Sequence, residues 1–219
     1  MVTAVAAERA RTLVLLAKEP VPGRVKTRLQ AEVTAVQAAM LAEASLRDTL
    51  AALAGMAAER RLVALDGRPG PWLPQGFDVV PQSGGGLDRR LAAAFAAALP
   101  GPDAGPAALV GMDTPQLAGA LATIDFAGVD AVLGLTSDGG YWVVGLREAR
   151  DDAFLGVPMS TPRTGAAQLR RLRSLGLRVR LLPTLRDVDV PADARLVAEQ
   201  APETLFAAAW RGLERRTTP

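Results

Sequence analysis

Short apolar runs alternate with alanine-rich stretches along most of this 219-residue chain, and this alternation constrains the fold more than any other feature. Apolar runs predict strands at 12–17, 61–65, 77–80, 107–112, 131–135, 141–146 and 178–182. Alanine- and leucine-rich stretches predict helices at 30–54, 87–99, 164–175, 192–200 and 203–215. Strands that alternate with helices in this way are typical of an α/β domain.

The sequence shows no internal repeat and no linker that would divide it. We therefore predict one domain over residues 1–219, with a core at about 12–200 and a closing helix at 203–215. In a doubly wound sheet, ligands bind beyond the carboxyl ends of the strands. Polar motifs that directly follow predicted strands are the candidates for function.

The chain contains no cysteine and no histidine. Their absence excludes Ser-His-Asp and Cys-His catalysis, disulfides, thiolate nucleophiles and cysteine-rich zinc sites. Chemistry must then come from carboxylates, Lys, Arg, hydroxyls, backbone amides or a bound metal. A metal held by oxygen ligands alone points to a hard cation, Mg²⁺ or Mn²⁺.

Charge and hydropathy argue against nucleic acid and membrane partners. The 25 basic and 23 acidic residues leave a net charge of only +2, so the sequence pI near 9.6 does not require a basic face. The apolar run at 13–17 is too short for a signal peptide, and no stretch approaches the roughly 20 residues that cross a bilayer. We expect a cytoplasmic protein; a homodimer stays open.

The first candidate motif is the loop KEPVPGRVKTR at 18–28, called the first loop below, which follows the first predicted strand. Gly23 permits close approach of the backbone to a ligand, and the cations of this loop could neutralise a di- or triphosphate. These cations are Lys18, Arg24, Lys26 and Arg28. An ordinary strand–helix connection with solvated charges explains the same residues equally well.

Two aspartate motifs also follow predicted strands. Asp113, in VGMDTP, stands where a carboxylate could hold a divalent cation against phosphate oxygens, although helix capping explains it as well. In DVDVPAD, Asp187 and Asp189 are expected to point to opposite sides of an extended segment, so that one of them joins Asp113. Capping of the helix at 192–200 is the alternative.

The turn SDGGYW at 137–142 holds the only tyrosine of the chain. Asp138 could hold acceptor hydroxyls or act as a base, with Tyr141 and Trp142 as an aromatic wall. A plain turn followed by a core strand accounts for the same residues.

Taken in order, KEPVPGRVKTRL, VGMDTPQL, LGLTSDGGYWVVGL and DVDVPAD resemble a bacterial family of nucleotide-diphospho-sugar-transferase-like proteins. Its members are labelled glycosyltransferases associated with radical-SAM, selenodomain or arsenosugar genes. The resemblance runs from about Leu13 to Val197. It implies a GT-A fold, a Rossmann-like domain with a mixed, mostly parallel sheet, related to the guanylyltransferases of molybdenum-cofactor and phospholactate biosynthesis.

The resemblance also assigns roles to residues. It places Lys18, Gly23, Arg24, Lys26, Arg28, Arg90 and Asp113 at the nucleotide, and Asp113 and Asp189 at Mg²⁺ or Mn²⁺, with Asp187 as the alternative second ligand. It places Asp138, Gly139, Gly140, Tyr141 and Trp142 at the acceptor. Lys26, Asp113 and Asp138 are the expected catalytic residues.

The leading hypothesis is a metal-dependent transferase that moves a sugar from a nucleotide sugar to a small acceptor. The first alternative is a nucleotidyltransferase that joins an NTP to a phosphorylated small molecule and releases pyrophosphate, which the cations of the first loop favour. The second alternative is a protein that binds nucleotide without turnover.

Overall fold

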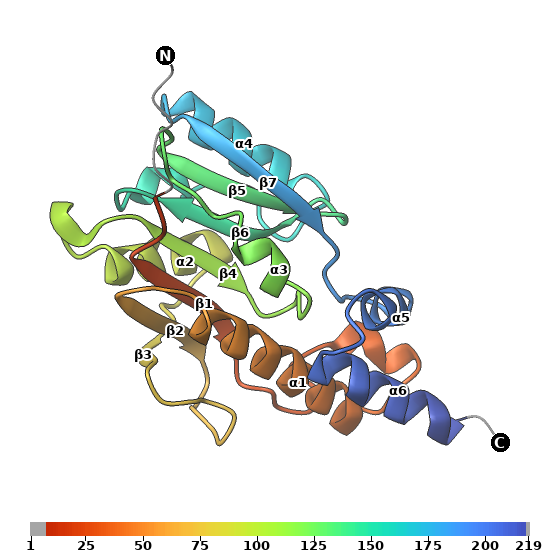
Figure 1. The fold of residues 1–219 in the computed structure, drawn as a ribbon. Helices are drawn as coiled ribbons and strands as arrows, with labels where there is room; N and C mark the ends of the chain where they lie inside the picture. The colour runs from red at the N-terminus through yellow and green to blue at the C-terminus, as the bar shows by residue number, and fades with distance from the viewer. Residues whose placement is uncertain (1–7, 218–219) are drawn as a thin grey trace, which may run out of the picture.

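The described part of the computed structural model, residues 8–217, is built around a seven-stranded sheet in the order β3-β2-β1-β4-β6-β5-β7 (Figure 1). Neighbouring strands pair in parallel except where β6 meets β4 and β5. Six strands therefore run in one direction and β6 runs against them. The strands are β1 Thr12–Lys18, β2 Arg60–Asp66, β3 Asp78–Pro81, β4 Ala107–Gly111, β5 Ala131–Thr136, β6 Tyr141–Leu146 and β7 Val179–Leu185.

Helices lie on both faces of this sheet. The α-helices are α1 Ala35–Ala54, α2 Leu87–Ala98, α3 Ala118–Leu121, α4 Thr164–Ser174, α5 Pro191–Gln200 and α6 Leu205–Thr217. Short 3-10 helices are η1 Thr27–Ala31, η2 Pro102–Ala104 and η3 Asp151–Ala153. None of the helices within residues 8–217 combines the length and apolarity that a membrane crossing requires.

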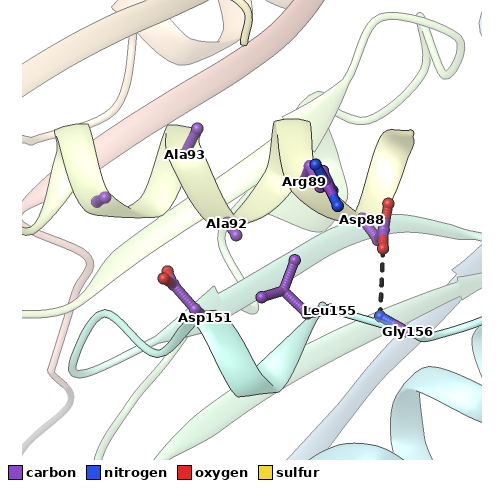
Figure 2. Close-up of a pocket in the computed structure, with 8 residues that line it drawn as sticks. Asp88, Arg89, Ala92, Ala93, Asp151, Leu155 and Gly156 are labelled. Carbon is purple, nitrogen blue, oxygen red and sulfur yellow. Dashed lines mark hydrogen bonds between the residues drawn. The ribbon is translucent and has the colours of Figure 1, made fainter. Parts of the chain in front are cut away.

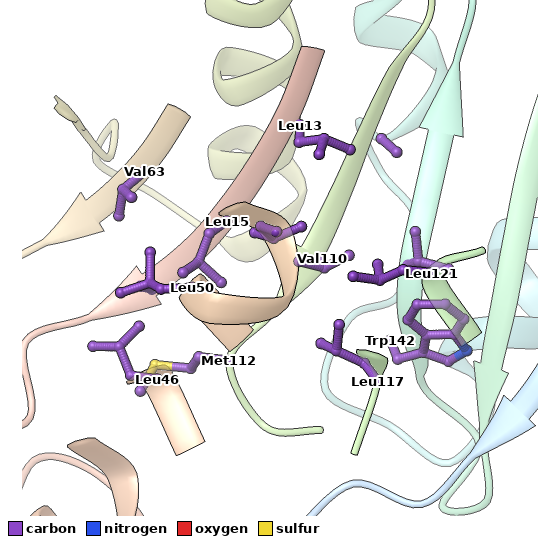
Figure 3. Packing of buried hydrophobic residues seen from close by; sticks show 14 of the residues in the cluster. Leu13, Leu15, Leu46, Leu50, Val63, Val110, Met112, Leu117, Leu121 and Trp142 are labelled. Atoms are coloured by element: carbon purple, nitrogen blue, oxygen red, sulfur yellow. The ribbon is translucent and has the colours of Figure 1, made fainter. Parts of the chain in front are cut away.

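Alternation along the strands divides the core between the two faces. Leu13 and Leu15 of β1 face α1, where they pack with Leu46 and Leu50 (Figure 3). Val14, between the two leucines, faces the opposite cluster, formed with α2, η3 and α4. This period of two is the geometry of a strand buried on both faces, and it explains why the predicted strands read as continuous apolar runs.

A third apolar cluster joins the end of the chain to α1. Phe206 and Trp210 of α6 pack with Leu41 of α1 and with Val188, the residue between two of the candidate aspartates. Asp48 of α1 accepts hydrogen bonds from the backbone N–H groups of Leu205 and Phe206 at 2.9 Å each, which ties the start of α6 to α1. The last two helices thus brace the segment that carries Asp187 and Asp189.

The predicted α/β architecture, with a mixed and mostly parallel sheet, is confirmed. The closing helix predicted at 203–215 spans Leu205–Thr217, and the start of one other helix is wrong by more. The helix predicted at 30–54 begins at Ala35, because Thr34 and Gln37 form a capping box there and residues 27–31 form a separate 3-10 turn. The short helix α3 was not among the predicted elements. The outer ends of the predicted domain, 1–7 and 218–219, lie outside the described residues.

Candidate active site

A cleft of about 860 Å³ opens at the edge of the sheet where six of the seven strands end. Strand order reverses between β1 and β4, since the chain runs outward from β1 to β2 and β3 and then returns to place β4 on the other side. Such a reversal leaves a crevice beyond the strand ends, the usual ligand site of doubly wound sheets. The first loop begins at Lys18, the last residue of β1, and Asp113 comes two residues after the end of β4, so both stand at this crevice.

Most of the residues predicted to form a site line this cleft together. They are Lys18, Arg24, Lys26, Arg28, Arg90, Asp113, Asp138, Gly140, Tyr141, Trp142 and Asp189, with Asp187 beside them. Gly23 and Gly139 stand back from the lining. Their positive φ angles of 79° and 94° shape the first loop and the β5–β6 turn instead.

Lys26 is held at the centre of the cleft in a left-handed backbone conformation, with φ 48° and ψ 36°. Its side chain is only 4% exposed, and Nζ lies 2.5 Å from Asp113 Oδ1 and donates to Val188 O at 2.6 Å. A lysine in this conformation costs backbone energy that surrounding contacts must offset. Ser160, with φ 57°, is the other non-glycine residue of positive φ within 8–217, and it lines the same cleft.

Asp113 connects the end of β4 to the segment after β7. Its backbone carbonyl accepts from the N–H of Val188 at 2.9 Å, and the carbonyl of the preceding Met112 accepts from Ser45 Oγ at 2.6 Å. Its carboxylate is half exposed and forms the ion pair with Lys26. The residue is therefore fixed by its backbone while one side of its carboxylate stays open to the cleft.

Three carboxylates gather on the other side of Asp113. Oxygens of Asp138, Asp187 and Asp189, called the acidic trio below, all lie within 4.8 Å of one another. Asp189 also forms an ion pair with Arg28 at 2.6 Å. Of the predicted metal pair, Asp189 belongs to the trio, while Asp113 pairs with Lys26. The pair of Asp113 and Asp189 as metal ligands stays a prediction.

The expectation that Asp187 and Asp189 point to opposite sides is wrong. Both carboxylates line the cleft, while Val188 between them is buried among the helices α1, α5 and α6. Residues two apart in an extended segment lie on the same side, and the residue between them faces the other way. The segment therefore supplies two carboxylates to the cleft at once.

Crowding of these carboxylates changes their protonation. Burial, with the negative charges of Asp138 and Asp189 added, raises the pKa of Asp187 to about 6. Burial also raises the pKa of Asp189, against the opposing effects of Arg28 and Lys26. Both shifts come first from burial, and the neighbouring carboxylates add to them.

The β5–β6 turn holds Asp138 in place. Asp138 Oδ1 accepts from Thr136 Oγ1 at 2.6 Å and from the N–H of Gly140 at 2.9 Å. Gly139 lies against the segment before α4, where a Cβ would come within 2.0 Å of Pro162 O. The turn is closed by these contacts, and its aspartate is oriented before any ligand arrives.

The two aromatic residues predicted at the acceptor are mostly buried. Trp142 is 2% exposed, packs in the core on the α1 face and donates its indole N–H to Pro183 O at 3.0 Å. Tyr141 packs with the opposite core cluster, its hydroxyl lies 3.5 Å from Gln168 Oε1, and burial raises its pKa. They contribute to the cleft wall by packing, not as an exposed aromatic surface.

Two residues outside the predicted set organise the side of the cleft near β2 and β3. Asp66, the last residue of β2, lies 3.7 Å from Arg24 and 3.3 Å from Arg90 in ion pairs with both. Gln82, directly after β3, donates to Ala17 O and Ala64 O at 2.7 and 2.9 Å. Both follow the rule that polar residues at strand ends are candidates, but each stands alone without a motif around it.

A second, shallower pocket of about 500 Å³ lies between α2 and η3 (Figure 2). Alanines of α2 and Leu155 form most of its wall, and Asp88 accepts from the N–H of Gly156 at 3.2 Å across it. This hydrogen bond, with that from Arg89 next, lowers the pKa of Asp88. The pocket holds none of the residues predicted to form a site.

Comparison with known families gives a match over more than half of the chain. Residues 27–161 match the family described as an uncharacterized protein conserved in bacteria, DUF2064. No curated protein is significantly similar to the sequence.

Solved structures share the fold. A crystal structure from Desulfovibrio desulfuricans G20, provisionally described as a nucleotide-diphospho-sugar transferase, is 26% identical, with a TM-score of 0.82 over 94% of this chain and 98% of that one. The 2-C-methyl-D-erythritol 4-phosphate cytidylyltransferase from Thermus thermophilus is 17% identical, with a TM-score of 0.52 over 89% of this chain and 100% of that one. The inositol-1-phosphate CTP transferase from T. maritima is 12% identical, with a TM-score of 0.52 over 93% and 98%.

Proposed function

The chain belongs to the bacterial DUF2064 family. From this membership and from the cleft, we propose that it is a metal-dependent transferase that uses an activated nucleotide. Its donor would be a nucleotide sugar and its acceptor a small molecule. The observation that carries the proposal is the arrangement of charge in one cleft. Cations of the first loop and α2 meet a group of carboxylates at the ends of β4, β5 and β7.

The cationic side fits the phosphates of a nucleotide. The first loop supplies Lys18, Arg24, Lys26 and Arg28, and the start of α2 adds Arg90. Arg24 and Arg90 share Asp66, which holds their guanidinium groups at the cleft without cancelling both charges. Guanidinium groups bind phosphate oxygens through paired hydrogen bonds, and several cations together offset the charge of a diphosphate leaving group.

The acidic trio fits a hard divalent cation. Its donor set is all oxygen, as Mg²⁺ and Mn²⁺ prefer. Burial, and after it the charges of Asp138 and Asp189, raises the pKa of Asp187, and a bound cation would oppose this shift. When bound, such an ion would supply positive charge that offsets the charge developing on the leaving phosphate. Asp187 and Asp189 would hold it, and Asp113, freed from Lys26, is the further candidate from the sequence. Asp138 beside them would stay available as a base.

The transfer itself balances with the groups present. An acceptor hydroxyl oxygen forms the new bond to the anomeric carbon of the donor sugar, while the bond from that carbon to the phosphate oxygen breaks. The nucleoside diphosphate leaves with the bonding electrons, and the hydroxyl proton passes to a carboxylate. Asp138, oriented by Thr136 and Gly140, is the proposed base.

Nucleotidyl transfer is the second candidate, because cytidylyltransferases share the fold and the loop carries enough cations for a triphosphate. In that reaction the acceptor oxygen attacks the α-phosphorus of an NTP, and pyrophosphate leaves with the bonding electrons. The two reactions place different leaving groups against the same cations, so their products separate them.

The test is a ³¹P NMR assay of wild-type protein with Mn²⁺ or Mg²⁺, nucleotide sugars, NTPs and a mixed pool of acceptors. We expect a nucleoside diphosphate to appear and Asp113→Ala to slow its release by at least about tenfold. Pyrophosphate would instead identify nucleotidyl transfer. Tight nucleotide binding without any product in all conditions would overturn the enzyme proposal and leave a nucleotide-binding protein.

A further inference from the structure

The charges that line the cleft are segregated along the edge of the sheet. All five basic side chains among its lining residues come from the first loop and the start of α2. Two of them reach across the cleft, where Lys26 meets Asp113 and the Val188 carbonyl and Arg28 meets Asp189. The other side is formed by the β5–β6 turn, the segment before α4 and the segment after β7, called the acceptor half here. Its members are Asp138, Gly140, Tyr141, Trp142, Ser160, Thr161, Pro162, Thr164, Asp187 and Asp189.

Carboxylates and hydroxyls dominate this acceptor half. Within residues 8–217, none of its lining residues is a lysine or arginine, and three are aspartates. Neither Asp138 nor Asp187 forms an ion pair with any described residue. Two cations of the other half reach across to this side, and both already have anionic partners: Asp113 pairs with Lys26 at 2.5 Å, and Asp189 pairs with Arg28 at 2.6 Å.

From this segregation we infer that the acceptor is a neutral, hydroxyl-bearing molecule without a phosphate or carboxylate group, a sugar or other polyol. The inference deepens the proposed function and rests on it. Carboxylate oxygens accept hydrogen bonds from hydroxyls, whereas an anionic group placed beside Asp138 and Asp187 would meet like charge in a partly desolvated cleft. Phosphorylated acceptors need cations that this half of the described cleft does not offer.

A divalent cation on the acidic trio does not reverse this preference. Two positive charges would offset Asp138 and Asp187, while Asp189 keeps Arg28. The acceptor half would then be close to neutral, without a surplus that could hold a phosphate ester. The metal would also be committed to the donor phosphates, which lie toward the cationic side.

The test compares matched ligands by ligand-observed NMR, with and without nucleoside diphosphate and Mg²⁺. The pairs are glucose and glucose 6-phosphate, glycerol and glycerol 3-phosphate, and mannitol and mannitol 1-phosphate. For at least one pair, we expect the neutral member to bind wild-type protein at least about tenfold more tightly than its phosphate ester. An ester that binds as tightly as its parent, or more tightly, overturns the inference.

A variant that adds a cation to the acceptor half gives a second test. Its readout is the ratio of two affinities for the same variant, so a partial loss of folded protein does not change it. Thr161→Arg places a guanidinium at the exposed rim of the acceptor half and should shift the ratio of ester to parent affinity by about tenfold toward the ester. Thr123→Arg adds the same charge on an exposed residue outside the cleft and should leave the ratio unchanged. Equal ratios in wild type and Thr161→Arg would count against the inference.

The two proposals fail in different ways. If no nucleoside diphosphate binds but the neutral ligands still do, the proposed function fails and the preference of the acceptor half stands. If nucleotide binds and none of the six ligands does, the acceptor inference is overturned while the nucleotide site remains.

Discussion

Two residues of the cleft have unfavourable conformations or surroundings in the folded chain, and neighbouring groups offset only part of the energetic cost. Lys26 has a left-handed backbone, and its ammonium group is buried between Asp113 and the Val188 carbonyl. Asp187 sits half-buried beside Asp138 and Asp189 and forms no ion pair with any residue of 8–217. Strained or uncompensated residues of this kind gather at functional sites, where a ligand supplies what the fold leaves out.

The pKa of Asp187 predicts how stability depends on pH. Its carboxyl titrates at about 6 in the folded chain and near 4 in an unfolded one, so the folded chain holds the extra proton between these values. Stability therefore falls as pH rises from about 4 to about 6, and the cost is fully present above 6. Asp187→Asn should be more stable than wild type by about 1–2 kcal/mol at pH 7, after allowance for solvent screening, and no more stable near pH 4.

Urea unfolding in metal-free buffer at these two pH values measures the difference. An equal gap between Asp187→Asn and wild type at both values would show that this carboxyl is not perturbed.

The Lys26–Asp113 pair should couple more strongly than an exposed pair. A double-mutant cycle of Lys26→Met and Asp113→Asn is expected to give about 1–2 kcal/mol of coupling in the free energy of unfolding, because Lys26 is nearly buried. The control cycle uses Glu43 and Arg47, a pair on α1 whose side chains are each 40% exposed, for which about 0.3–0.5 kcal/mol is expected. The same coupling in both cycles would contradict the central position of Lys26.

At the scale of elements, turns and segment ends place the site. The β5–β6 turn fits against the segment before α4, where the N–H of Gly165 donates to Gly139 O at 2.8 Å. The segment after β7 is fixed to the end of β4 by the bond from Val188 N–H to Asp113 O, and Val188 is packed under α6. The acidic trio therefore depends on contacts between elements that are distant in sequence.

Substitutions at Gly139 and Gly23 distinguish the stability cost of a steric clash from the cost of an unfavourable backbone conformation. Both have positive φ, but a Cβ at Gly139 would meet Pro162 O at 2.0 Å, while one at Gly23 would meet no atom within 4 Å. Gly139→Ala should cost about 3 kcal/mol or more of stability, and Gly23→Ala about 1 kcal/mol. Chemical denaturation of both variants measures the two costs, and equal losses would show that the turn does not depend on this contact.

The sequence predicted the helices and strands better than it predicted which of their residues come together in space. Strands and polar strand ends follow from local period and composition, so the first loop, Asp113 and the β5–β6 turn could be found. The order of the strands is not local, and it is this order that brings Asp138 beside Asp187 and Asp189. Asp66 and Gln82 escaped notice because each is a single polar residue after a strand.

At the scale of the whole molecule, one sheet edge carries a gradient of charge. Six strands end there, cations follow β1, and carboxylates follow β4, β5 and β7. Helices on both faces bury the rest of each strand, so the polar ends are the part of the sheet open to a ligand. The fold thereby places cations and carboxylates in a single cleft, where Lys26 meets Asp113 and Arg28 meets Asp189.

A divalent cation should stabilise the folded chain through the acidic trio. At 100 times its Kd, Mn²⁺ or Mg²⁺ would add about 2.7 kcal/mol to the free energy of unfolding and raise the thermal midpoint. The double variant Asp138→Asn, Asp187→Asn should lose most of this increment. Thermal unfolding with and without metal measures it, and an equal increment in the double variant would place the ion elsewhere.

The central claim is that nucleotide phosphates bind at the cations of the first loop. Its most direct test is calorimetric titration of a nucleoside diphosphate with Mg²⁺ into wild type, Arg24→Gln and Arg47→Gln. Arg24 lines the cleft and Arg47 lies on α1 away from it. We predict about a tenfold loss of affinity for Arg24→Gln and none for Arg47→Gln. Equal affinity in all three proteins, or no binding to wild type, would contradict the account.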